Sequence, residues 1–130
     1  MKAAEIRAKF FNRRLKVQDF EVTLPGLEGL NGKLALRELT AKEVVQAERL
    51  SKDETGRNEA LETAAFVTYS LITREGKEQI FSEQDIDGVA GFGMSVLSPI
   101  AEKIRELSAI DVDETQKNLK QTTSNTSPTS

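Results

Sequence analysis

Apolar residues recur at helical spacing between residues 40 and 110, and this pattern predicts four helical segments that pack on one another. The first segment begins with a capping box, in which Thr40 and Glu43 each bond the other's backbone amide. The longest segment, over 58–74, is apolar on more than one side. Such a helix is typical of the centre of a fold, where its neighbours wrap around it.

The third and fourth segments are shorter or less regular. Ser82 is a suitable cap for the third, and its buried side is predicted to carry Ile86, Val89 and Ala90. Pro99 suits the first position of the fourth segment, since proline is favoured there. If the helix begins earlier, at Met94, Pro99 lies inside it and is expected to kink it.

The pattern before residue 40 is different. Ala3–Phe11 predicts a short helix that ends at Asn12, with Ile6 and Phe10 on one face. From residue 15 the period changes to two, because Phe20, Val22 and Leu24 alternate with polar residues as in a half-buried strand. Asn31-Gly32 predicts a two-residue hairpin turn. These signals predict a small antiparallel ribbon.

The predicted fold is therefore mainly α, with three parts. Residues 1–14 form a basic N-terminal arm or short helix. Residues 15–110 form a single globular domain, with a β-hairpin over 15–38 and a small bundle of about four helices over 40–110. Residues 111–130 are expected to be a disordered polar tail, because 13 of the 16 residues from Thr115 to Ser130 are Thr, Ser, Asn, Gln or Pro.

The composition narrows the chemistry that the chain can perform. Its 130 residues include no cysteine and no histidine, which excludes disulfides, Cys/His zinc sites and nucleophiles activated by imidazole. Catalysis by carboxylates, lysine or an oxygen-ligated metal stays formally open, but Asp85 and Asp87 point about 200° apart on a helix, so they cannot share one acid–base site without help from other groups. The glycines at 88, 91 and 93 read GxxGxG after an acidic helix, unlike a dinucleotide-binding turn. We predict no catalytic residue, no cofactor, no metal and no enzymatic activity.

Charge is distributed unevenly along the chain. Residues 1–16 carry six basic residues and one acid, a formal charge of +5, while the rest of the chain sums to −8. A basic arm with Lys9, Arg13 and Arg14 could bind nucleic acid or an acidic partner. The simpler interpretation is a solvated helix face, and the overall acidity makes nucleic acid an unlikely partner.

Membrane association and secretion are not expected. No apolar run approaches the about 20 residues of a helical membrane span. The charged segment after Met1 also lacks the apolar core of a secretory signal. The sequence therefore predicts a cytoplasmic protein with no membrane partner.

Three pieces of the sequence resemble one known family. Arg37-Glu38-Leu39-Thr40 enters a helix of the type Leu-Thr-Ala-x-Glu. An acidic, glycine-centred turn leads to Phe81-Ser82-Glu83-Gln84-Asp85, a Phe-x-x-x-Asp pattern. A segment of small residues precedes a closing helix that ends in Leu107-Ser108-Ala109-Ile110. In this order, from Leu34 to Ile110, they resemble the tail assembly chaperones of long-tailed, siphovirus-type bacteriophages.

The resemblance implies a function without catalysis. Such proteins bind the aggregation-prone tape-measure protein before the tail tube polymerises around it. They act in the host cytoplasm and are not retained in the mature virion. Many also exist in a frameshifted form, whose C-terminal extension recruits the tail tube protein. The polar tail after Asp111 would suit a linker to such an extension, and self-association is expected.

A chaperone of this kind must expose apolar area to its client. The candidate partner-binding residues are Phe66, Tyr69, Phe92, Met94 and Leu97. Methionine adapts to varied surfaces, and the glycines around Phe92 would let the site reshape. Each residue taken singly also fits a buried core position, but we expect at least two of the five to be accessible to solvent.

Overall fold

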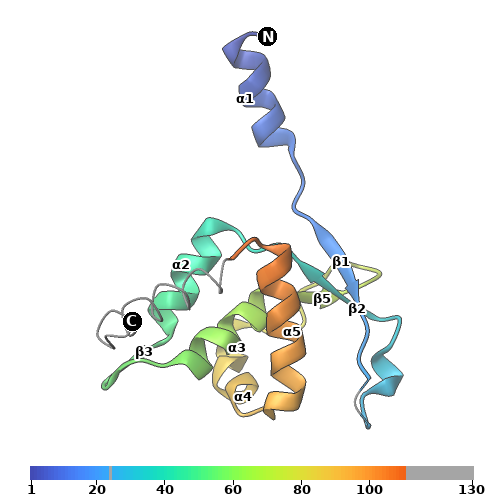
Figure 1. The fold of residues 1–130 in the computed structure, drawn as a ribbon, viewed down its shortest axis with the longest axis vertical. Helices are drawn as coiled ribbons and strands as arrows, with labels where there is room; N and C mark the ends of the chain where they lie inside the picture. Colours follow the sequence, from blue (N-terminus) through green and yellow to red (C-terminus); the bar gives the residue numbers. More distant parts are fainter. Residues whose placement is uncertain (24, 111–130) are drawn as a thin grey trace, which may run out of the picture.

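The computed structural model describes residues 1–23 and 25–110 of the chain. Within them, a mainly helical body carries a small sheet on one side, and one helix stands clear of it (Figure 1). The predicted polar tail, 111–130, lies outside the described residues. In chain order the elements are α1 (Ala3–Asn12), β1 (Val17–Phe20), the 3-10 turn η1 (Glu28–Leu30), β2 (Leu34–Arg37), α2 (Ala41–Leu50), β3 (Lys52–Asp53), β4 (Gly56–Arg57), α3 (Glu59–Ser70), β5 (Leu71–Thr73), the 3-10 turn η2 (Glu83–Asp85), α4 (Ile86–Ala90) and α5 (Met94–Leu107).

Helix α3 is at the centre, as its apolar pattern predicted. It packs against α2, α4, α5 and β2, and every residue from Ala64 to Ser70 is buried. Asn58 caps its N-terminus by accepting bonds from the amides of Ala60 and Leu61. The alanines let neighbouring helices approach closely, so that the part of α3 from Ala64 onward has no face left for water.

The C-terminal boundary predicted for α3 is wrong. The helix ends at Ser70, and Leu71–Thr73 form β5, which pairs with β2 in antiparallel register. The sheet order is β1-β2-β5, with β2 in the middle. A central strand needs backbone partners on both edges, and β5 supplies them on the side away from β1. The helices therefore share their core with a sheet.

The predicted ribbon is present, but its turn differs. β1 pairs with β2 from Val17↔Arg37 to Phe20↔Leu34, so a long connection joins them in place of a two-residue turn. The Asn31 side chain accepts a bond from the Val22 amide at 2.6 Å and holds this connection closed. Asn31 has φ −63° and ψ 137°, and Gly32 has φ +82°, which is a type II turn. The predicted strand residue Leu24 lies outside the described residues.

The last two helices meet around the glycine-rich segment. η2 continues into α4, whose buried side includes Ile86 and Val89 as predicted. α5 begins at Met94, so Pro99 lies inside it and the earlier of the two predicted starts is correct. Its inner face buries Leu97, Ile100, Ala101, Ile104 and Leu107.

Two buried hydroxyls on α3 test how polar groups in this core affect stability. Thr68 has no hydrogen-bond partner for its hydroxyl, whereas Ser70 donates to the Arg37 carbonyl at 2.7 Å. We expect Thr68→Val to raise the free energy of unfolding by up to about 1 kcal/mol, because it removes an unpaired buried hydroxyl. Ser70→Ala should lower it by about 1–2 kcal/mol, because it leaves a carbonyl without its donor. Urea denaturation measures both, and equal losses in the two variants would contradict the assignment.

Candidate functional site

Two hollows lie side by side on the body, and Phe81 lines both. The first, the α2 groove, has a volume of about 1190 Å³ and runs between α2 and residues 79–85, with Tyr69 of α3 also in its lining. Val45 and Ile80 in this lining are exposed, and Lys42, Arg49, Glu83 and Asp85 add charges of both signs. The groove is therefore open and mixed in character.

The second hollow, the Phe92 cleft, is smaller and almost entirely apolar. Its volume is about 240 Å³. One wall comes from the β1–β2 connection, with Phe20, Val22, Leu27 and Leu30, and the other from Phe81, Phe92, Val96 and Pro99. The rings of Phe81 and Phe92 meet edge to face, with centroids 5.8 Å apart. Such a lining suits an apolar side chain.

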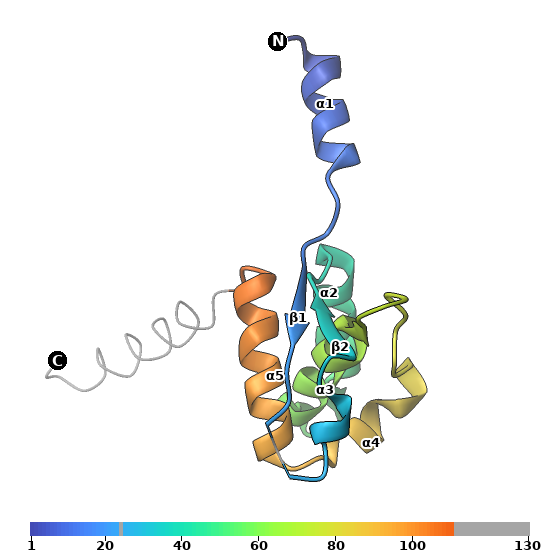
Figure 2. The ribbon, with the colours of Figure 1, turned by 90° about the vertical axis from the view of Figure 1, so that its right-hand side faces the viewer.

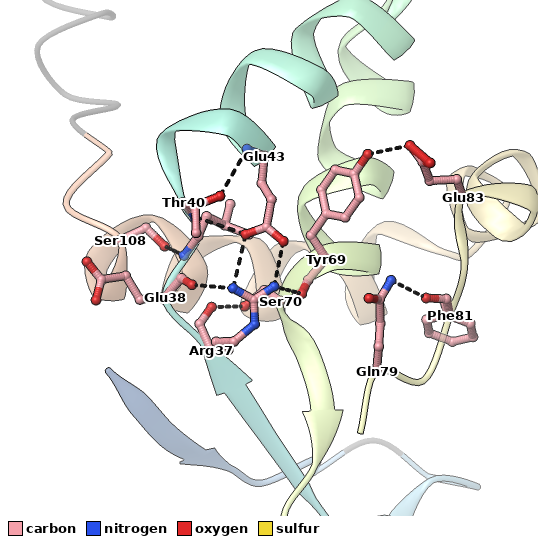
Figure 3. A network of polar contacts seen from close by, with 11 residues as sticks. Arg37, Glu38, Thr40, Glu43, Tyr69, Ser70, Gln79, Phe81, Glu83 and Ser108 are labelled. Carbon is pink, nitrogen blue, oxygen red and sulfur yellow. Dashed lines mark hydrogen bonds and ion pairs between the residues drawn. The ribbon is translucent and has the colours of Figure 1, made fainter. Parts of the chain in front are cut away.

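A network around Arg37 holds the elements that frame the α2 groove (Figure 3). The Arg37 guanidinium donates to both carboxylate oxygens of Glu43, at 3.0 and 2.6 Å, and to the Tyr69 carbonyl at 2.8 Å. Thr40 and Glu43 exchange the two bonds of the predicted capping box, at 2.9 and 3.2 Å. One guanidinium thus joins the end of β2, the start of α2 and the end of α3.

Two ionisable groups beside the groove have shifted pKa values. Burial acts to raise the pKa of Glu43, but the bonds from Arg37 and from the Thr40 amide outweigh it and hold this pKa below its usual value. Burial raises the pKa of Tyr69, and its hydroxyl also donates to the Glu83 carboxylate at 2.7 Å. Glu43 therefore remains ionised, and Tyr69 neutral, at neutral pH.

The five candidate contact residues divide into two groups. Phe92 is 40% exposed at the Phe92 cleft and Met94 is 71% exposed at the start of α5, so the expectation of at least two accessible residues is confirmed. Phe66, Tyr69 and Leu97 are buried, and as exposed contact residues these predictions are wrong. They fail because α3 is covered by its neighbours and Leu97 faces inward on α5.

Sequence reasoning missed much of the Phe92 cleft. Leu30, Phe81 and Val96 line it, yet each belongs to a local pattern that also fits a core position. The missing information was the fold of the β1–β2 connection, which brings Leu27 and Leu30 opposite α5. The glycines on either side of Phe92 were the available signal, because a residue without a side chain covers little of a neighbouring ring.

The basic arm is a separate surface. Arg13 bonds to Glu38 at 3.1 Å, while Lys9 and Arg14 form no ion pair within the described part of the chain. No residue of α1 is buried, so Ile6, Phe10 and Phe11 are exposed to solvent. The Arg7 guanidinium lies 4.7 Å from the centre of the Phe11 ring, a cation–π contact. α1 thus presents cations and aromatic rings together.

Metal-binding and membrane-spanning features are absent from the described residues. Across 1–23 and 25–110, no group of three or more Asp or Glu side chains is placed to hold a metal ion. No helix in this part of the chain combines the length and apolar character needed to cross a bilayer. Comparisons with protein-family models, with curated proteins and with solved structures found no match.

The Arg37–Glu43 pair should make stability depend on pH in the acidic range. The pKa of Glu43 is lowered by folding, so the pair stabilises the fold above the pKa of the unfolded chain, and this contribution is lost as pH falls through the folded value. Glu43→Gln should unfold more easily than the wild type at about pH 7, by about 1–3 kcal/mol, and this difference should shrink towards about pH 3.

Urea denaturation across that pH range measures the difference. Glu38→Gln is the matched control, because Glu38 also bonds to an arginine and has a lowered pKa, but its partner Arg13 is half exposed to solvent whereas Arg37 is not. Its effect should stay below about 1 kcal/mol. A Glu43→Gln difference that does not change with pH would contradict the role assigned to the pair.

Proposed function

We propose that this protein is a tail assembly chaperone of a long-tailed bacteriophage, and that it holds an apolar segment of the tape-measure protein in the Phe92 cleft. Two lines of reasoning support the proposal. The first is the resemblance to that family over Leu34 to Ile110. The second is an apolar hollow lined in part by Phe92, which is exposed, as is Met94 two residues further on.

The exposed phenylalanine at the Phe92 cleft is the observation that carries the proposal. Burying a phenylalanine or methionine side chain stabilises a protein by about 1.5–3 kcal/mol, so leaving both in water is unfavourable unless a partner covers them. Gly91 and Gly93 flank Phe92, and neither has a side chain to limit how its ring adjusts. The site is therefore suited to clients whose side chains differ.

The size of the two hollows indicates how a long client would bind. The Phe92 cleft, of about 240 Å³, accommodates one or two apolar side chains, as an amphipathic helix presents at i and i+4. The α2 groove continues beyond Phe81 and offers exposed Val45 and Ile80 to the next part of the same segment. In this proposal the tail tube protein is recruited by a C-terminally extended form, and the chaperone leaves before the virion matures.

Variants of the Phe92 cleft test the proposal. Phe92→Ser combined with Met94→Gln should weaken binding to co-expressed tape-measure protein by about tenfold or more, since central aromatic anchors dominate such contacts. Affinity pull-down followed by titration calorimetry measures the loss, and thermal melting reports whether the variant is folded.

The matched control is Val17→Thr. Val17 is as exposed as Phe92, at 42%, but lies on the edge strand β1. It should leave client binding unchanged. A folded Phe92→Ser/Met94→Gln variant that still binds the tape-measure protein like the wild type would refute this site, and a wild type that does not bind it at all would refute the function.

The alternative function is nucleic-acid binding by α1. The observation that favours it is the position of α1, which stands clear of the body with Lys9 and Arg14 free of ion pairs among the described residues (Figure 2). The acidity of the body counts against it, since residues 17–110 carry 17 acidic and 10 basic side chains. A nearby acidic surface repels phosphate.

A gel-shift experiment separates the two functions. We expect no shift of a short DNA or RNA duplex at about 50 mM salt, where binding to phosphates is strongest. A shift that Lys9→Gln/Arg14→Gln removes, and that the control Lys52→Gln/Lys103→Gln keeps, would favour the alternative. Its affinity would then fall by orders of magnitude towards about 200 mM salt.

A further inference from the structure

The lining of the Phe92 cleft contains a single charged residue among those that the structure describes. This residue is Glu21, which directly follows β1, and the only other polar residues of the lining are Thr23 and Ser95. A ligand that fills the cleft also removes water from the carboxylate at its edge, and an unpaired carboxylate resists that loss. The partner of Glu21 is therefore important for what the cleft can bind.

Arg74 supplies this partner. It follows β5, and its backbone amide donates to the Lys33 carbonyl at 2.8 Å. Its guanidinium donates to the Leu34 carbonyl at 3.1 Å, to the Phe20 carbonyl at 3.3 Å and to the Glu21 carboxylate at 2.5 Å. The Arg74 side chain thus crosses the sheet from β5 over β2 to β1 and reaches the edge of the cleft.

Arg74 also pairs with a second carboxylate. The Asp19 carboxylate lies 3.4 Å from the guanidinium, and the side chains of both acids are more than half exposed. Of these three residues only Glu21 lines the cleft. Arg74 can therefore act on a ligand through the charge of Glu21 or through the strands that it joins, and the two acids allow these effects to be separated.

Glu21 stays ionised when Arg74 is removed. The Gly32 amide donates to its carboxylate at 3.0 Å and is the larger cause of its lowered pKa, ahead of the bond from Arg74. Within residues 1–23 and 25–110, Glu21 forms no second ion pair. Without Arg74, the cleft would carry an uncompensated negative charge at its edge.

We propose that Arg74 sets the specificity of the Phe92 cleft. By pairing with Glu21, it lets the cleft take a neutral apolar side chain and removes the advantage that a cation would have there. In its absence, Glu21 would attract a positive charge attached to an apolar group and disfavour a neutral one. The inference rests on the proposed function and adds to it that the side chain of the client in the cleft has no lysine or arginine beside it.

The exposure of Glu21 limits the size of the effect. An ion pair whose carboxylate is more than half exposed contributes little, because water and salt screen it. We expect the relative affinity for a cationic and a neutral ligand to change by about threefold to fivefold at about 50 mM salt, and by less at about 0.5 M salt.

Two small ligands that differ in charge test the assignment. Phenylbutanol is neutral and phenylbutylamine carries a positive charge at neutral pH, and both end in a phenyl ring that a cleft of about 240 Å³ can hold. Titration of the isotope-labelled full chain, followed by NMR, gives both dissociation constants and shows whether the ligands bind at the cleft. The measured quantity is the ratio of the two dissociation constants.

Arg74→Met should raise the preference for the amine by about threefold to fivefold over the wild type and weaken binding of the alcohol. Arg74→Met/Glu21→Gln should return the ratio towards the wild-type value. Arg74→Met/Asp19→Asn is the matched control, because it has the same net charge and also loses an acid that pairs with Arg74, but keeps the carboxylate of the cleft. Its ratio should stay raised.

Thermal melting checks that each variant is folded. If Arg74→Met is not, Arg74→Gln replaces it in all three variants, since its amide keeps a donor for the Phe20 and Leu34 carbonyls without the charge.

Four results would overturn the proposal. They are a wild type in which neither ligand binds at the cleft, an Arg74 variant with the wild-type ratio, a Glu21→Gln double variant whose ratio stays raised, and an Asp19→Asn double variant whose ratio returns to normal. The proposed function fails separately. A wild type that binds both ligands as expected but does not bind the tape-measure protein would refute the function and leave the role of Arg74 intact.

Discussion

The bidentate pair between Arg37 and Glu43 is the interaction on which the arrangement of this protein depends. Arg37 ends the central strand and Glu43 belongs to the first turn of α2. The same guanidinium donates to the Tyr69 carbonyl and so also holds the end of α3 in place. A cation at the C-terminus of α3 and a carboxylate at the N-terminus of α2 both complement the helix dipoles. The pair is half-buried, so removing either partner leaves a charge without compensation. The α2 groove lies where α2 and Tyr69 of α3 come together, next to this pair.

The Arg37–Glu43 pair also explains why the segment Arg37-Glu38-Leu39-Thr40 carries information beyond helix capping. Each side chain in it has a separate task, because Arg37 joins three elements, Glu38 anchors the basic arm and Thr40 caps α2. The Leu39 amide donates to the Ser108 hydroxyl at 2.9 Å and ties the start of α2 to the end of α5. Four consecutive residues thus connect the arm, the sheet, the start of α2, the end of α3 and the end of α5.

Opposite ends of the molecule carry different surfaces. The arm at one end is basic and exposes aromatic rings, and the Phe92 cleft beside the β1–β2 connection is lined almost entirely by apolar residues. Phe81 lines both hollows and joins them into one continuous face, on which the client that we propose would lie.

The local elements of this protein could be predicted from its sequence, because they depend on neighbours within a few residues. The capping box at Thr40, the short helix at the N-terminus, the pairing of the two ribbon strands and the central position of α3 all follow from spacing and residue type. That at least two of the five candidate contact residues are exposed was also expected, although not which two. Tertiary structure decided where α3 ends, because only the unpaired edge of β2 makes Leu71–Thr73 a strand. It decided as well that Tyr69 and Leu97 are buried and that Leu30 faces α5 across a cleft. These features depend on contacts between residues far apart in the chain. The spacing of apolar residues within one segment does not show which of its surfaces another segment covers.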